Sequence, residues 1–386
     1  MTLNRILKFG FFSLAIFTFI MVSCSDDDPM VNPDPDPDPD PDTTSMMMDT
    51  MDIEVEATIE NLLTNQVKEV IIPTMQDYQV RAAGLLTATE AFVNNTSAST
   101  LEDLRSAYMD SYVAYQAAAV HDYYATVNVD LVNTTNLYPI DVEFLDELID
   151  TESYNFNVTA QQRANGFPAI DYLLYGLEDV VSSFSNEPKR ANFLLELAKA
   201  MKEKADNLVD RWTGSLEENF INNGGTELGS SVSVQLNGIM VYYEDHVRGN
   251  KVGLPIGRSG PNDTPFDPDP TIIEAYYQSI ENSNDDVSLA LLKAAVEEME
   301  DIYLGTTSLE DDGIGYEDLL LDRDQESLDT DIKNLYTEIY DKISNRTRIV
   351  GDDDLYNSIQ ALVTLYKSDL FPVLNVQDAD GSNDGD

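Results

Sequence analysis

One acidic residue, Asp171, follows a glycine–aromatic turn and stands in a short apolar run. The turn reads Asn165-Gly166-Phe167-Pro168, and the run ends at Gly176. Proline suits the first turn of a helix, because the first N–H groups of a helix have no partner inside it. The pattern therefore predicts a helix over 168–175 with Asp171 in its first turn. There the carboxylate either complements the helix dipole or binds a metal ion.

A second candidate segment, residues 243–257, concentrates charged groups and glycines. Its ionisable members include Glu244, His246, Arg248 and Lys251. We expect a helix to end before Gly249 and a shaped loop to follow. His246 and Arg248 then satisfy the free carbonyl groups of that helix end. Alternatively, the loop faces Asp171 and His246 supplies a second metal ligand.

A proline-centred segment upstream extends the first candidate site. Leu137-Tyr138-Pro139-Ile140-Asp141 places a tyrosine and an acid on either side of the proline. Asp141 either caps a helix predicted over 141–149 or lies with Tyr138 in the same cleft as Asp171. The only other histidine, His121, ends an apolar helix, where it suits the helix dipole.

These motifs resemble the imelysin family, which includes insulin-cleaving membrane proteases and their bacterial relatives. The family signature reads Gly-x-His-x-x-Glu, followed by apolar residues and a glycine, and Gly166, Phe167 and Gly176 fit it. Pro168 stands in place of the histidine, and Asp171 stands in place of the glutamate. A His–Glu pair three residues apart shares one helix face. Proline cannot be a metal ligand, so the pair has lost one member.

The resemblance implies two packed helical bundles, a nominal metallopeptidase activity and a link to iron or haem acquisition. Because the signature turn is kept while the His–Glu pair is not, we expect a binding protein that is not proteolytic. The alternative is a metallopeptidase of this family with an altered metal site, built from Asp171, His246 and Glu244. A weaker third option is binding of polysaccharide or peptide at the cell surface.

The residue counts limit the metal chemistry. The chain has two histidines and one cysteine, which excludes a histidine-rich zinc site. Carboxylates with one histidine suit a harder cation, so iron or calcium is expected ahead of zinc. The formal net charge of −49 repels nucleic acid, so no nucleic-acid partner is expected.

Residues 1–24 have the pattern of a lipoprotein signal peptide. A basic start precedes an apolar run, and Met21-Val22-Ser23-Cys24 resembles a lipobox with Cys24 as the lipidated residue. The acidic linker over 25–50 contains five Pro-Asp repeats and should be extended. Its start resembles a surface export signal, which predicts an outer-membrane lipoprotein on the cell surface, or alternatively one facing the periplasm. The expected partners are the membrane, through the lipid, and an outer-membrane transporter.

Apolar residues recur at helical spacing from residue 52 onward, and no comparable window alternates with period two. This predicts an all-α protein with helical bundles over 51–180 and 181–375 and an acidic tail over 376–386. Pro73 is expected to kink or interrupt a helix, and Ser99-Thr100-Leu101-Glu102 to form a capping box. A stripe of tyrosines is expected in the core, at 108, 112 and 115.

Overall fold

The computed structural model describes residues 56–123, 131–258, 264–281, 287–306, 313–351 and 353–379. The described residues all belong to one compact unit. The predicted signal peptide, Cys24 and the linker over 25–50 lie outside the described residues. The same holds for residues 380–386 of the predicted tail.

Every regular element in these ranges is helical, which confirms the all-α prediction. The α-helices are α1 (Ile59–Asn65), α2 (Ile72–Asn94), α3 (Ala98–Val120), α4 (Leu131–Thr135), α5 (Val142–Thr151), α6 (Gly166–Tyr175), α7 (Val180–Asn186), α8 (Pro188–Arg211), α9 (Glu217–Asn222), α10 (Ser231–Tyr242), α11 (Leu254–Ile256), α12 (Tyr276–Glu281), α13 (Val287–Leu304), α14 (Tyr316–Leu321), α15 (Glu326–Ser344), α16 (Asp354–Thr364) and α17 (Phe371–Leu374). A 3₁₀ segment, η2 (Thr159–Ala164), and the π-helical segments η1 (Gln66–Ile71), η3 (Trp212–Leu216), η4 (Tyr243–Gly253) and η5 (Leu365–Leu370) complete the set. Within the described ranges, no helix is both long and apolar enough to cross a bilayer.

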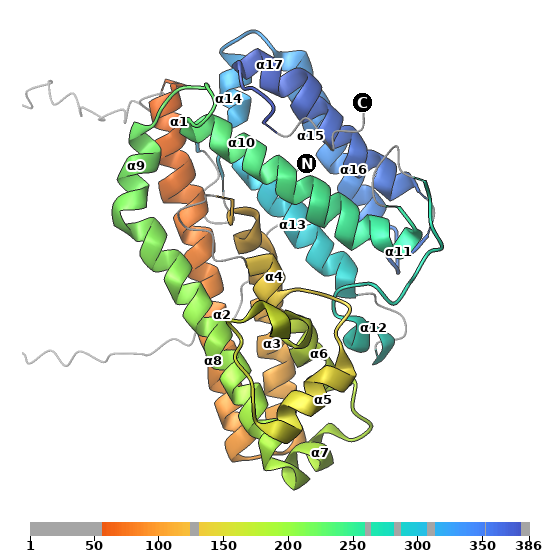
Figure 1. Cartoon of the computed structure of the whole chain (residues 1–386). Helices are drawn as coiled ribbons and strands as arrows, with labels where there is room; N and C mark the ends of the chain where they lie inside the picture. The colour runs from red at the N-terminus through yellow and green to blue at the C-terminus, as the bar shows by residue number, and fades with distance from the viewer. Residues whose placement is uncertain are drawn as a thin grey trace, which may run out of the picture. The chain divides into compact units, whose positions relative to one another are not determined.

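The long helices pack in two groups joined by α13. In one group α2 packs against α3 and α8, and in the other α15, α16 and η4 pack together (Figure 1). Helix α13 contacts α3 in the first group and α15 and η4 in the second. The packing does not follow the expected boundary near residue 180. Helix α8 lies beyond that boundary, yet its apolar stripe packs along α2.

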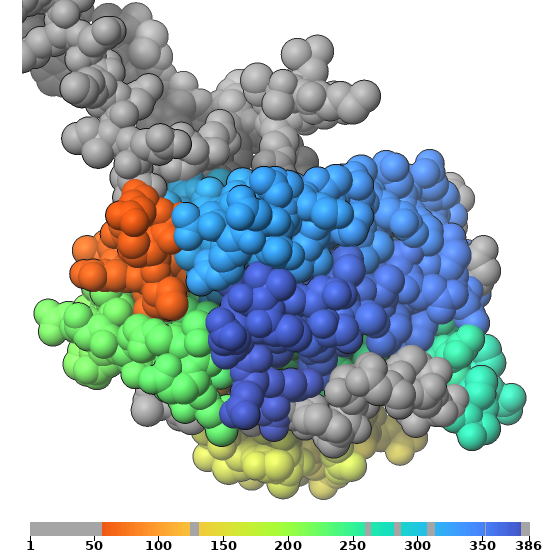
Figure 2. Space-filling view, turned by 90° about the horizontal axis from the view of Figure 1, so that it is seen from above, coloured from red at the N-terminus to blue at the C-terminus, as the bar shows by residue number. Residues whose placement is uncertain are grey.

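The core contains the predicted tyrosine stripe. Tyr108, Tyr112 and Tyr115 are fully buried, which confirms their assignment to the core. The start of the described fold is tied to the later chain by Asn65, whose side-chain amide donates to the Gly305 and Ile314 carbonyls at 2.6 and 3.1 Å. Figure 2 shows these orange N-terminal residues beside light-blue residues of the later chain.

Three prolines follow widened turns within continuous helices. Pro73, Pro255 and Pro372 each occupy the second residue of an α-helix, and each of these helices follows a π-helical segment. The residue before each proline donates its N–H group five residues back, as Ile72 does to Val67. A proline ring clashes with the carbonyl four residues back in a regular helix, and the wider π turn relieves that clash. Pro73 therefore interrupts the α pattern without ending the helix.

The N-cap of helix α3 lies two residues before the start of the predicted capping box. This N-cap is Ser97, whose hydroxyl accepts from the Thr100 backbone N–H at 3.3 Å. The Thr100 hydroxyl accepts in turn from the Ser97 N–H at 3.2 Å. The predicted box over 99–102 was wrong because threonine, and not glutamate, provides the returning side chain.

Candidate functional site

The turn before α6 is shaped by Gly166, which has a φ of +71°. An alanine here would place its Cβ against the backbone carbonyl of Thr135. Only glycine permits both this φ and this close approach. Asn165 fixes the turn, because its side chain accepts from the Gly166 N–H at 2.7 Å and donates to the Thr134 and Phe156 carbonyls at 2.8 and 3.1 Å.

Phe167 anchors the turn in the core. Its ring stacks on Tyr112 with centroids 4.2 Å apart and planes 2° from parallel. At the other end of α6, Gly176 allows a second close approach. A Cβ at Gly176 would lie 2.9 Å from the Tyr277 ring. The two signature glycines therefore fit α6 between the end of α4 at Thr135 and helix α12.

Asp171 has a different structural role from the one predicted. Helix α6 begins at Gly166, so Asp171 lies beyond the first turn and does not complement the dipole of its own helix. Its carboxylate instead accepts from the backbone N–H groups of Tyr277 at 2.7 Å and Gln278 at 3.1 Å. These are among the unsatisfied donors at the start of α12. Pro168 is the third residue of α6, where its missing N–H leaves no gap in the hydrogen bonding.

Burial changes the acidity of Asp171. The residue is 2% exposed, and this desolvation raises its carboxyl pKa from 3.8 to about 7. The two backbone N–H groups oppose that rise, because they stabilise the charged form. A buried carboxyl that titrates near neutral pH is a feature of many functional sites.

A cavity of about 210 Å³ opens beside Asp171. Its walls come from the loop before α5, from α6 and from the segment that leads into α12. The lining residues are Tyr138, Pro139, Ile140, Pro168, Asp171, Thr271, Ile273, Ala275, Tyr276 and Tyr277. Tyr138 thus shares a cavity with Asp171, whereas Asp141, which the cleft interpretation placed with them, is not among the lining residues.

Asp141 lies outside that lining and acts as a helix cap. Its side chain accepts from the Phe144 N–H at 3.0 Å, at the start of α5. It also pairs with Arg163 at 3.1 Å. These contacts match the structural interpretation of Asp141, and both of them hold the loop that carries Tyr138.

The second segment is a continuous helix rather than a loop. Segment η4 runs to Gly253 and continues into α11, so no helix end forms before Gly249. The expectation of a loop was wrong because the π-helical turns accommodate the glycines without breaking the hydrogen bonding. His246 and Arg248 therefore do not cap a helix terminus at this position.

The charged residues of η4 point to different neighbours. Glu244 pairs with Lys367 at 2.5 Å and with Arg248 at 3.6 Å, and the Arg248 guanidinium donates to Gln360 at 2.6 Å. Residues 244 and 248 are one helical turn apart and share a face. That face meets α16 and η5, so the contacts of Glu244 and Arg248 are with the second group of helices.

Lys251 belongs to a buried polar network that the sequence did not indicate. Its ammonium lies 2.6 Å from both carboxylate oxygens of Glu274 and 2.6 Å from the Gln116 side-chain oxygen. Asn136 donates to the same carboxylate at 2.5 Å. Burial lowers the pKa of Lys251, while the Glu274 carboxylate opposes that shift. A lone acid in Ile272-Ile273-Glu274-Ala275 was the available signal for this partner.

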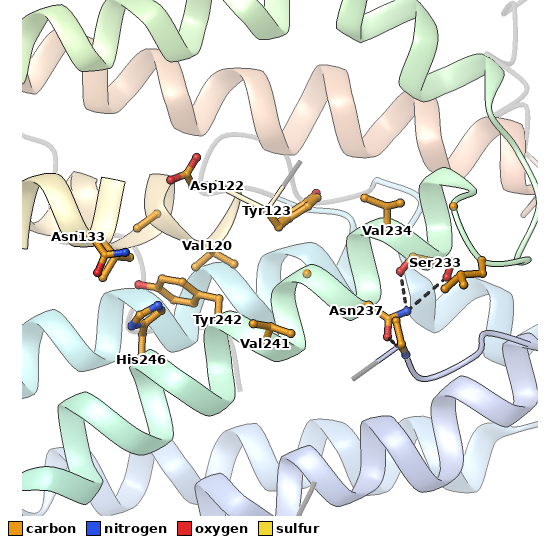
Figure 3. A pocket seen from close by; sticks show the side chains of 16 residues that line it. Val120, Asp122, Tyr123, Asn133, Ser233, Val234, Asn237, Val241, Tyr242 and His246 are labelled. Atoms are coloured by element: carbon orange, nitrogen blue, oxygen red, sulfur yellow. Dashed lines mark hydrogen bonds between the residues drawn. The ribbon is translucent and has the colours of Figure 1, made fainter. Parts of the chain in front are cut away.

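His246 lines a larger cavity of about 500 Å³. Figure 3 shows Tyr242 on α10 and His246 on η4, with Asn133, Asp122 and Tyr123 contributed by other segments. Asp171 and His246 line different cavities, and Tyr138 lines both the Asp171 cavity and a space of about 10 Å³ beside His246. The structure therefore does not bring the two predicted metal ligands together.

His121 is fully buried at the end of α3 and bonds across to α13. Its Nε2 lies 2.5 Å from the Glu298 carboxylate, which also accepts from the Thr74 hydroxyl at 3.2 Å. The predicted role at the helix end is incomplete, since the ring contacts a side chain of another helix. This contact ties α3 of the first group to α13, the helix that contacts both groups.

The residues around Asp171 do not fit a catalytic metal. Pro168 offers no ligand atom, and the Asp171 carboxylate already accepts two backbone N–H groups. Over the described ranges, no group of three or more histidine, cysteine, aspartate or glutamate residues could hold a metal ion. A catalytic zinc takes three protein ligands. No reaction step through a resident metal follows from this geometry.

Comparisons with known proteins find one matching family model and solved structures with a similar fold. A family model described as imelysin matches residues 71–370. An imelysin-like protein from Psychrobacter arcticum has a similar structure, with 14% identity and a TM-score of 0.67 over 84% of this chain and 98% of that one. A candidate iron-regulated protein A precursor from Parabacteroides distasonis gives 16% identity and a TM-score of 0.65 over 84% and 96%. No curated protein sequence matches.

Proposed function

Because the chain belongs to the imelysin family, we propose that it is a non-enzymatic binding protein of the cell envelope that takes part in iron or haem acquisition. The description of the Parabacteroides distasonis protein as iron-regulated supports the link to iron. The cavity beside Asp171 supplies a place for a ligand. The proposed receiver of the cargo is an outer-membrane transporter.

The contact between Asp171 and α12 carries the proposal. A peptidase of this family would use its signature acid on a metal ion or a water molecule. Here that acid holds the backbone of Tyr277 and Gln278, and Pro168 replaces its histidine partner. The signature turn is present with a cavity beside it, whereas position 168 has no histidine to join Asp171 in activating water.

The two cavities differ in the cargo they suit. The 210 Å³ cavity lies below the range typical of drug-sized ligands, so it suits an ion or a small molecule. The 500 Å³ cavity beside His246 lies within that range and is the candidate for a larger cargo such as haem. Calcium is the alternative ion, because Asp171 in the smaller cavity and Asp122 in the larger one each contribute carboxylate oxygens.

The location is part of the same proposal. Cys24 would carry the lipid, and the acidic linker over 25–50 would hold the folded unit away from the membrane. Protease treatment of intact cells tests surface exposure. Digestion of the protein on intact cells supports export to the surface, and survival until the outer membrane is permeabilised supports the periplasmic alternative.

Calorimetric titration of the mature chain tests the cargo. We expect saturable binding of ferrous or ferric iron or of haem, and weaker binding of zinc. Calcium is titrated as the alternative ion, and potassium as the comparison for general attraction to an acidic protein. If neither form of iron nor haem saturates the chain, the iron proposal is wrong.

One observation favours the second candidate, a peptidase with an altered site. The Asp171 carboxyl has a pKa of about 7, which suits a general acid or base at neutral pH. Cleavage of an unfolded protein substrate that disappears in Asp171→Asn, but persists in Glu90→Gln, would support this candidate over the binding protein. Glu90→Gln also replaces one carboxyl group by an amide, but at an exposed position on α2. It therefore controls for the loss of an acidic group elsewhere on the chain.

A further inference from the structure

The cavity beside Asp171 combines aromatic walls with one carboxylate. Tyr138, Tyr276 and Tyr277 line it together with the apolar residues Ile273 and Pro168. Among its described lining residues, Asp171 is the only one with a carboxylate. The faces of aromatic rings attract cations, and they do so most strongly where water is excluded.

Two of the rings form a corner. The Tyr276 and Tyr277 centroids lie 5.2 Å apart with their planes at 72°. Rings at this angle present surfaces in two directions, as aromatic cages for methylated ammonium groups do. Tyr138 adds a third ring from the loop before α5. The three tyrosines are partly exposed, so the cavity is open to entering ligands.

The Asp171 carboxylate retains capacity for a ligand. A carboxylate has about four acceptor positions, and Tyr277 and Gln278 take two of them. The residue lines the cavity although it is 2% exposed, so a ligand charge there would meet it with little screening by water. The chain's net charge of −49 also favours the approach of cations.

We propose that this cavity binds a small organic cation, a methylated ammonium group on a short aliphatic tail, with the tyrosine rings around the methyl groups and the Asp171 carboxylate as counter-ion. This inference rests on the binding-protein proposal in assuming that the cavity receives a ligand. It differs in naming an ammonium compound, which neither iron nor haem binding would require.

Ligand binding is coupled to protonation of Asp171. The ionisable groups around this carboxylate are Glu281 and Tyr277 on α12, Tyr108 on α3 and Tyr175 on α6, and Arg105 on α3 pairs with Glu281 at 3.2 Å. The cation binds the charged carboxylate, so below pH 7 it must displace a proton. Affinity should rise by up to about tenfold per pH unit towards pH 7 and level off above it.

Calorimetry with choline chloride as probe tests the inference on the mature chain at pH 8. The matched control is 3,3-dimethylbutan-1-ol, which has the shape of choline without its charge. Potassium chloride at equal concentration reports the general attraction of cations. We expect saturable choline binding, at least about tenfold weaker binding of the alcohol, and no competition from potassium.

Variants assign the effect to the cavity. Asp171→Asn keeps an acceptor for α12 but removes the charge, and should weaken choline binding at least about tenfold. Tyr276→Leu should weaken it about fivefold, whereas Tyr276→Phe keeps the ring and should stay within about twofold. Glu90→Gln should leave it unchanged. Circular dichroism of each variant confirms that it is folded.

The outcomes separate this inference from the proposed function. Equal affinity for choline and the alcohol, or full affinity in both Asp171→Asn and Tyr276→Leu, would overturn the inference. Absence of choline binding in a chain that binds iron or haem would overturn it and leave the proposed function standing. Choline binding without iron or haem binding would support the ammonium site beside Asp171 and would reject iron and haem as the cargo.

Discussion

The carboxylate of Asp171 accepts the backbone N–H of Tyr277 at 2.7 Å, although 106 residues separate the two along the chain. The contact fastens the start of α12 to the middle of α6. It joins the signature segment over 165–176 to α12, which lies about 100 residues later in the chain. The cavity lies at this junction, so both segments shape it.

The pH dependence of stability should carry a contribution from Asp171. Its carboxyl pKa is about 7 in the fold and 3.8 without burial, so the folded chain binds the proton more tightly. Stability should therefore fall as pH rises from about 4 to 7, by up to about 1.4 kcal/mol per pH unit from this residue. Asp171→Asn should remove that part of the slope. Urea unfolding of both proteins at pH 5 and pH 8 measures it, and equal slopes would contradict the burial argument.

Gly166→Ala should destabilise the chain by at least about 3 kcal/mol, because it combines a φ of +71° with a clash against Thr135. Gly84→Ala is the matched control. Gly84 lies within α2 with nothing near its Cβ position, so alanine should stabilise by about 0.5–1 kcal/mol. Thermal unfolding of the two variants should shift in opposite directions. A neutral Gly166→Ala would show that the turn can relax.

Lys251→Met should destabilise the fold by about 3–5 kcal/mol, because it leaves the Glu274 carboxylate buried without its cation. The double variant Lys251→Met/Glu274→Met should recover part of the loss, since both charges are then gone. The Gln116 side chain would lose its contacts to both residues and the Asn136 NH2 group would lose its acceptor, which prevents full recovery. Chemical unfolding of both single variants and the double variant gives the coupling energy. Additive losses would show that the pair does not interact.

Pro168→His should create metal affinity where the native chain lacks a ligand. The new imidazole would lie three residues from Asp171, on the same face of α6. Zinc titration of Pro168→His should show at least about tenfold tighter binding than the native chain. Pro168→Asn, with a side chain of similar size, should show no gain. If the histidine variant folds but gains nothing, the held carboxylate is unable to turn towards a metal.

Helical spacing was sufficient to predict much of the fold. The stripes of α2, α3 and α8 and the buried tyrosines on α3 follow directly from local sequence. The glycine–aromatic turn was also visible, because Gly166 and Phe167 meet requirements set by their immediate surroundings. The position of α8 beside α2 was not predictable in this way, since an apolar stripe does not specify its partner.

The candidate site depended on contacts that local sequence does not encode. Asp171 looked like a first-turn acid, but its hydrogen-bond partners lie in α12. Glu274 was missed because it lies in a segment without regular spacing, and only the fold brings it to Lys251. The π-helical turns of η4 were hidden too, since glycines and Pro255 favour a loop when read locally.

The widened turn before α2 constrains how this chain can change in length. An α-helix rotates by about 100° per residue, and η1 places Tyr78, Leu85 and Phe92 on the buried side of α2. Deletion of one residue from η1 would swing that side towards solvent while leaving every side chain chemically intact. Substitutions in this stretch should therefore be tolerated during evolutionary divergence far more often than single-residue losses.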